Sequence, residues 1–116
     1  MPYVLYCIDK PGRGAQRAGV RAAHLAYISR RTGAFVYGGP LHDESGQVRG
    51  SLMVLDLPDR TALDTHMRGD PFFGADLFES VTIWSTRQVI PEREPGALAR
   101  ELQAAALGGT PSARPA

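Results

Sequence analysis

The sequence contains a single cysteine, Cys7, among its 116 residues. One cysteine excludes an intrachain disulfide, and its place in an apolar run favours a buried, inert thiol over a nucleophile. The chain also lacks any apolar segment near the ~20 residues of a membrane-spanning helix. Residues 1–10 have no basic segment and are too short for a secretory signal. These absences predict a cytosolic protein with no membrane contact.

The sequence also has no large excess of positive or negative charge. The net charge is +1, and Lys10 is the only lysine. The arginines are scattered, with no basic run and no interleaved aromatic residues, so the electrostatic pattern of a nucleic-acid-binding protein is missing. The sequence therefore predicts no nucleic-acid partner.

What the chain does have is enough hydrophobic sequence, 43%, for the core of one domain. Short runs of β-forming residues predict strands at 3–8, 34–37, 51–57 and 77–89. Helical periodicity predicts helices at 14–31 and 59–67, the second with Asp59 as its N-cap. The order βαββαβ predicts an α+β, ferredoxin-like domain with an antiparallel sheet over residues 1–90.

Glycine and proline mark the predicted breaks between these elements. Gly33 is expected to end the first helix, and the sequence Gly38-Gly39-Pro40 is expected to close the second strand with a turn. Residues 91–116 change in composition and form a separate C-terminal segment. An extra helix is predicted at 97–107, followed by a tail rich in proline, glycine and alanine at 108–116.

The predicted strands are apolar on both faces. Residues 3–8, YVLYCI, show no polar alternation, and neither does most of 52–55, LMVL. Two helices can cover only one face of a four-stranded sheet, so a second layer is needed for the other. The sequence predicts a homodimer with sheets packed face to face. The alternative is that the C-terminal helix folds back over the open face.

His24 lies in the apolar stripe of the first predicted helix, which consists of Val20, Ala23, His24, Tyr27 and Ile28. By itself such a residue is often a core histidine bonded to a carbonyl. Arg17, Arg21 and Arg30 lie largely off this stripe, where a helix arginine is usually solvated. His42 lies in a predicted polar loop and is expected to be solvated.

The segment Asp70-Pro71-Phe72-Phe73 has two interpretations. An aspartate N-cap followed by proline is a standard start for a helical turn. An aspartate carried on an apolar turn is also partly desolvated, so its charge needs a partner such as a histidine. His66 and Asp70 are four residues apart, but Gly69 argues against a shared helix face, and no paired-ligand motif for a metal is present.

Several short motifs, in this order and spacing, resemble the YciI-like (YCII-related) family of the dimeric α+β barrel group. They are Tyr3-Val4-Leu5-Tyr6 with Asp9, Arg21-Ala22-Ala23-His24-Leu25-Ala26, Gly39-Pro40, Gly50-Ser51, Asp70-Pro71-Phe72 and Phe78-Glu79-Ser80-Val81. The resemblance runs over residues 3–89. The segment from Pro40 to Gly50 is shorter than in many members, and residues 91–116 have no counterpart.

The resemblance implies a ferredoxin-like dimer with a pocket in each subunit and a histidine–aspartate pair that needs no metal or organic cofactor. Carried over by position, the catalytic pair is His24 and Asp70. The implied substrate-binding residues are Ser51, Gly39, Pro40, Phe72 and Arg21.

Three functions remain open at this point. The first is a cofactor-independent lyase, isomerase or dehydrochlorinase-like enzyme that uses His24 and Asp70 as an acid–base pair on an unknown small molecule. The second is a binding module with the same pocket and no chemistry. The third is a structural dimerisation domain, which predicts no cavity beside His24.

Overall fold

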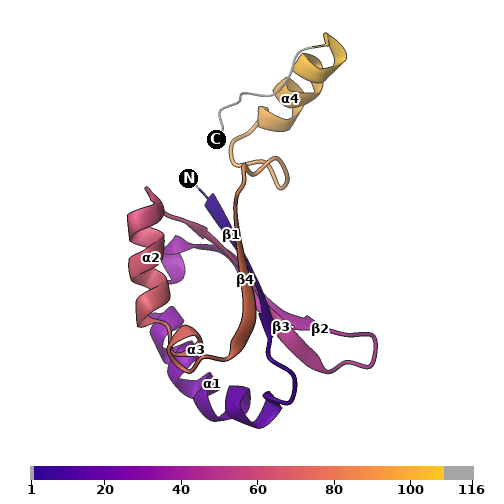
Figure 1. Cartoon of the computed structure of the whole chain (residues 1–116). Helices are drawn as coiled ribbons and strands as arrows, with labels where there is room; N and C mark the ends of the chain where they lie inside the picture. Colours follow the sequence, from indigo (N-terminus) through magenta and orange to yellow (C-terminus); the bar gives the residue numbers. More distant parts are fainter. Residues whose placement is uncertain (1, 109–116) are drawn as a thin grey trace.

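The computed structural model describes residues 2–108. The four strands and the helices between them follow the predicted order βαββαβ (Figure 1). The strands are β1 (Pro2–Asp9), β2 (Phe35–His42), β3 (Val48–Asp56) and β4 (Phe78–Ser85). The helices are α1 (Gly14–Ser29), the short 3₁₀ helix η1 (Thr32–Ala34), α2 (Arg60–Gly69), α3 (Pro71–Gly74) and α4 (Ala97–Ala106). The predicted tail at 109–116 lies outside the described residues.

The sheet is antiparallel throughout and has the strand order β2-β3-β1-β4. The first and third strands are therefore central, as the βαββαβ order predicts. Their register pairs Leu5 with Met53 and Cys7 with Ser51. The α+β fold class with an antiparallel four-stranded sheet is confirmed.

One face of the sheet carries the core. Leu5, Cys7, Met53 and Leu55 are almost fully buried on this face, and Leu63 of α2 packs against them. All helices between β1 and β4 cover this same face (Figure 1). Burial of these aliphatic side chains stabilises the layer by roughly 1.5–3 kcal/mol each.

The second strand differs from its prediction. Gly38, Gly39 and Pro40 lie inside β2 and do not form the expected turn, and Pro40 pairs with Ser51 of β3. Because β2 is at the edge of the sheet, a proline without an N–H group is tolerated there. The turn follows at residues 43–47, so His42, expected in a loop, is the last residue of β2.

Gly50 allows β3 to run close to β1. A Cβ atom at this position would lie 2.0 Å from the carbonyl oxygen of Cys7. The close approach places Ser51, the next residue, directly across from Cys7 on the helix-covered face.

The other face of the sheet is open within the described chain. Cross-strand pairing aligns Tyr37, Val54, Val4 and Trp84 in one row across all four strands, with Leu52 and Tyr6 in the next row. The exposed fractions of Tyr6, Tyr37 and Trp84 are 45%, 53% and 64%. Large aromatic side chains in a continuous row on an exposed sheet face are typical of an interaction surface.

The C-terminal helix does not cover this face, so the alternative of a folded-back helix is not what the structure shows. Helix α4 lies beyond the end of the sheet, past the C-terminal end of β4 (Figure 1). Arg87 holds it there through two hydrogen bonds of 2.9 and 2.6 Å to the Glu101 carboxylate. Within residues 2–108, no helix is long and apolar enough to cross a membrane.

Candidate functional site

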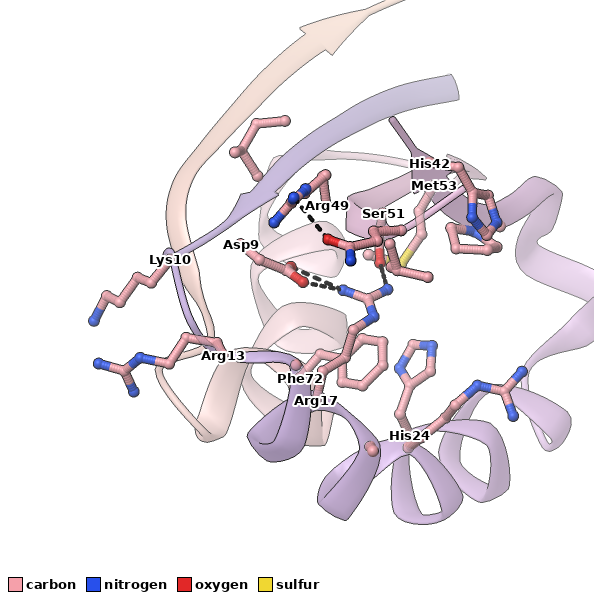
Figure 2. A pocket seen from close by; sticks show the side chains of 18 of the residues that line it. Asp9, Lys10, Arg13, Arg17, His24, His42, Arg49, Ser51, Met53 and Phe72 are labelled. Atoms are coloured by element: carbon pink, nitrogen blue, oxygen red, sulfur yellow. Dashed lines mark hydrogen bonds and ion pairs between the residues drawn. The ribbon is translucent and has the colours of Figure 1, made fainter. Parts of the chain in front are cut away.

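A cavity of about 1060 Å³ lies between α1 and the helix-covered face of the sheet. Its wall includes His24 from α1, Ser51 from β3 and Phe72 from α3 (Figure 2). Arg21 of α1 also lines it. Ligand sites in proteins commonly have about 300–1,000 Å³, so the cavity has room for a small molecule. A cavity at His24 counts against a purely structural domain.

His24 and Asp70 form a pair at the inner wall of this cavity. The His24 Nδ1 atom lies 2.7 Å from Asp70 Oδ1. The His24 side chain is 10% exposed and the Asp70 side chain is fully buried. Because an ionised carboxylate only accepts hydrogen bonds, His24 donates its Nδ1–H to Asp70, and in the neutral imidazole this leaves Nε2 as the acceptor. The Nε2 atom has no partner among residues 2–108, and the ring lines the cavity.

The local sequence explains how Asp70 reaches this position. Helix α2 ends at Gly69, and Asp70 has extended backbone dihedral angles that separate α2 from α3. Asp70 Oδ1 also accepts a 3.0 Å hydrogen bond from the Phe72 amide, and Pro71 occupies the first turn of α3. Capping and pairing with His24 therefore occur together through one oxygen.

The Phe72 ring packs between the His24 imidazole and the Arg17 guanidinium. It is parallel to the His24 imidazole, with a centroid distance of 3.7 Å and an angle of 7°. The guanidinium carbon of Arg17 lies 4.6 Å from the ring centroid. The next residue, Phe73, packs against Phe78 in the core, with ring centroids 5.1 Å apart. The two adjacent phenylalanines thus fix the site and anchor it to the sheet.

The sequence analysis was wrong about Arg17, which was expected to lie off the buried stripe of α1. Arg17 is 8% exposed. Its guanidinium donates to both oxygens of Asp9, at 2.8 and 3.0 Å, and to the Ser51 hydroxyl. The spacing 17, 21, 24 places Arg17 on the same helix face as His24, but its burial depends on the ion pair with Asp9, which the spacing does not reveal.

Ala23 is the second error in that stripe, because its side chain is exposed. The buried residues of α1 are Arg17 and His24. Each lies three or four residues, about one helical turn, from Val20 and Arg21. Helix α1 packs the polar side chains of Arg17 and His24 toward the sheet. Its buried face therefore differs from the apolar stripe that hydrophobicity alone predicts.

The cavity wall is rich in positive charge. Lys10, Arg13, Arg17, Arg21 and Arg49 line it, against the carboxylates of Asp9 and Glu79. Arg17 is neutralised by Asp9, Lys10 by Asp76 and Arg49 by Asp43. Arg21, by contrast, has no hydrogen-bond or ion-pair partner within residues 2–108, and it lies one turn before His24.

Gly39 and Pro40 line the cavity from β2. All seven residues of the predicted site therefore gather in one region, with Asp70 behind His24 and the other six on the cavity wall. Their roles in binding or catalysis remain predictions. In the described part of the chain, no group of three or more histidine, cysteine or acidic residues is arranged to hold a metal ion.

Cys7 lies beneath the site and is fully buried. Burial, together with the negative charge of Asp70, raises the pKa of the Cys7 thiol to about 12. A thiol with such a pKa forms little thiolate at neutral pH and is a poor nucleophile.

Comparison with known proteins agrees with this geometry. Residues 1–87 match the model of the YCII-related domain. None of the curated proteins compared with the chain matches it. Among solved structures of the dimeric α+β barrel type, the chain is similar to the 5-chloro-2-hydroxyhydroquinone dehydrochlorinase TftG from Burkholderia phenoliruptrix AC1100 in complex with 2,5-dihydroxybenzoquinone. The identity is 25%, the TM-score is 0.71, and the match covers 76% of this chain and 95% of the other.

A second similar structure is SnoaB from Streptomyces nogalater, a cofactor-independent oxygenase. Its identity is 19%, its TM-score is 0.50, and the match covers 78% of this chain and 96% of SnoaB. This level of similarity concerns the fold alone. One of the two similar proteins is named as a dehydrochlorinase and the other as an oxygenase, so the two differ in the reaction they catalyse.

We predict that Cys7 does not react with iodoacetamide in the folded protein at pH 8, because burial and the pKa of about 12 keep the thiol protonated and inaccessible. Mass spectrometry of the alkylated chain measures the reaction, and the same chain in denaturant is the control, where Cys7 reacts fully. Equal rates in both conditions would show that the thiol is open to solvent.

Proposed function

The chain belongs to the YCII-related domain family, and from this premise we propose that it is a cofactor-independent enzyme that moves a proton on a small molecule. His24 is the acid–base group, and Asp70 orients it. The reaction class is a lyase or isomerase reaction, with dehydrochlorination as one form. The single observation that supports this proposal most strongly is the 2.7 Å contact between His24 and Asp70 at the wall of the cavity.

Each group has a defined task in this proposal. His24 Nε2 removes a proton from a bound substrate, and the imidazolium that forms is stabilised by the Asp70 carboxylate at Nδ1. In an elimination, the electron pair of the broken bond to hydrogen forms a double bond, and chloride leaves with its own pair. In an isomerisation, His24 returns the proton to a different atom. Hydroxylated aromatic and enolisable carbonyl compounds have protons acidic enough for this step.

Arg21 is proposed as the group that binds negative charge on the substrate. It lines the cavity beside His24 and has no carboxylate partner in the described chain. An anionic oxygen of the substrate would form a charge-assisted hydrogen bond with its guanidinium. Ser51, Gly39, Pro40 and Phe72 would form the rest of the binding surface, with Ser51 held by Arg17.

The protein is also proposed to act as a homodimer with the open sheet faces packed together. The exposed row across the sheet contains Tyr37, Val54, Val4 and Trp84. A second copy presents an identical apolar surface, and two such surfaces are self-complementary about a two-fold axis. Removing this area from water is favourable by roughly 25 cal/mol per Å².

For the proton-transfer step, we predict that His24→Gln lowers turnover by about 10²–10⁴-fold. Glutamine retains an amide donor for Asp70 but has no group that accepts and returns a proton. Deuterium incorporation or halide release is measured with a panel of chlorinated hydroquinones and enolisable ketones in D2O. The control is Glu44→Gln in the β2–β3 turn. Normal turnover by His24→Gln would refute the acid–base role, and binding without any conversion by the unmodified protein would favour a binding module.

For the anion site, Arg21→Gln is expected to weaken binding of 2,5-dihydroxybenzoate by about 10–100-fold, which corresponds to the roughly 1.5–3 kcal/mol of a charged hydrogen bond. Binding of the neutral 2,5-dihydroxybenzamide should change little. Isothermal titration calorimetry measures both ligands, and Arg21→Lys serves as the charge-preserving control. Equal losses for the two ligands would show that Arg21 does not recognise the charge.

For the dimer, Trp84→Asp should convert the protein to a monomer, because it replaces the most exposed aromatic side chain of the apolar row with a charge. Sedimentation velocity at micromolar concentration measures the mass. Ala22→Asp makes the same change in charge on the exposed surface of α1 and should remain dimeric. A monomeric unmodified protein, or a dimeric Trp84→Asp variant, would contradict this interface.

A further inference from the structure

Asp70 has a second carboxylate oxygen that the pair with His24 does not use. Its Oδ2 atom is buried and has no hydrogen-bond partner among residues 2–108. Buried polar atoms in folded proteins nearly always have a partner, because a buried acceptor without one loses its hydration and gains nothing in return. A donor is therefore expected close to Asp70 Oδ2.

His66 supplies a matching group. It is fully buried, and its Nε2 atom is the other buried side-chain atom without a partner in the described chain. His66 is in the last turn of α2, and Asp70 is the residue that ends this helix. Burial lowers the pKa of His66 and the negative charge of Asp70 raises it, so Asp70 lies within electrostatic range of the His66 ring.

Arg31 fixes which nitrogen of His66 carries the proton. Its Nε–H donates to His66 Nδ1 at 3.1 Å. A guanidinium has donors only, so Nδ1 must be the acceptor and the proton of the neutral ring is on Nε2. Burial is the largest influence on His66 and lowers its pKa, which keeps the ring neutral at pH 7. The unpartnered Nε2–H is thus a donor, and the unpartnered Asp70 Oδ2 is an acceptor.

We propose that His66 is a positioning residue for the His24–Asp70 pair: its Nε2–H donates to one ordered water, which in turn donates to Asp70 Oδ2. Asp70 is then linked to an imidazole through each oxygen, to His24 directly at Oδ1 and to His66 through the water at Oδ2. The catalytic consequence depends on the proposed function, whereas the hydrogen bond itself does not.

Neighbouring side chains hold His66 in place. The Tyr27 hydroxyl donates to the His66 carbonyl oxygen at 2.9 Å, and Phe35 packs edge-on against the imidazole at 5.6 Å between ring centroids. A Cβ atom at Gly69 would lie 2.5 Å from the Tyr27 hydroxyl, so the glycine leaves room for that contact. The charged or titratable groups that face the His66 ring are Arg31, Asp70, His24 and Tyr27.

The contact explains why Asp70 keeps one orientation. With Oδ1 held by His24 and the Phe72 amide, and Oδ2 held by His66 through the water, the carboxylate plane cannot rotate. The His24 ring then keeps its Nδ1–H toward Asp70 and its Nε2 toward the cavity. Arg31, His66, the water, Asp70 and His24 form a continuous hydrogen-bonded chain from the edge of the helical layer to the cavity.

The first test is the proton position on His66, read by ¹⁵N–¹H correlation spectroscopy of the imidazole rings at pH 7. The expected result is a neutral ring protonated at Nε2, with a slowly exchanging Nε2–H signal that moves in Asp70→Asn. Arg31→Met removes the donor at Nδ1, but the proposed link to the acceptor-only Asp70 carboxylate still requires the proton on Nε2, so this tautomer should persist in the variant. A charged His66, or a ring protonated at Nδ1 in the unmodified protein, would overturn the proposal.

The second test compares His66→Leu with His66→Gln, which retains a donor. His66→Leu should lower kcat about tenfold with little change in KM and should broaden the His24 Nδ1–H signal, while His66→Gln should recover most of both. If His24→Gln abolishes turnover but His66→Leu leaves both readouts unchanged, the positioning role is wrong and the proposed enzyme remains. If neither variant affects turnover while the His66 Nε2–H signal still depends on Asp70, the proposed acid–base role of His24 is wrong and the hydrogen bond of His66 remains.

The dependence of stability on pH gives a check that does not require a substrate or a folded His66→Leu. Because the folded protein holds His66 neutral, the unfolded chain binds an additional proton below the ordinary histidine pKa of 6.5. Stability from this group is therefore complete above pH 6.5 and is lost as the pH falls, by at most about tenfold in the folding equilibrium constant per pH unit. Arg31→Met should make this loss smaller, because it removes a neighbouring positive charge that opposes protonation. An identical loss in both proteins would contradict the proposed environment of His66.

Discussion

The burial of the Asp70 carboxylate is the constraint on which the site depends. A charge removed from water is costly unless hydrogen bonds and an opposite charge compensate for it. Here the compensation comes from two elements, the His24 imidazole on α1 and the Phe72 amide on α3, at 2.7 and 3.0 Å. Breaking either contact leaves a buried charge undercompensated. The requirement to satisfy Asp70 therefore fixes where α1 and α3 lie relative to the end of α2.

The two faces of the sheet differ in the features they carry. On the helix-covered face, Leu5 and Met53 build the core, and Ser51 turns toward the cavity between that core and α1. On the opposite face, Tyr6 and Trp84 stand exposed in an apolar surface. Successive side chains of β1 point to opposite faces of the sheet, and both faces are apolar. For this reason the strand has no polar position between its ends. The cavity on one face and the exposed apolar surface on the other thus share only the backbone of the central strands.

Much of the fold followed from the sequence because local signals and topology agreed. The Asp59 and Asp70 caps, the apolar central strands and the βαββαβ order all pointed to the same domain. The approach of His24 to Asp70 could not be derived from spacing, since 46 residues separate them, and it was anticipated only through resemblance. Gly39 and Pro40 were misassigned because turn-forming residues are tolerated in an edge strand. Arg17 was misassigned because a helix arginine is usually solvated, and its burial depends on Asp9, a tertiary partner that periodicity cannot reveal.

The most direct test of the central claim is a crystal structure of the protein soaked with 2,5-dihydroxybenzoquinone, the molecule bound to the similar dehydrochlorinase. The expected result is a ligand in the cavity, with one of its oxygens within hydrogen-bond distance of His24 Nε2 while Nδ1 remains bonded to Asp70. A ligand bound elsewhere, or a His24 ring turned away from Asp70 with the cavity closed, would contradict the assignment of this pair as the reactive centre.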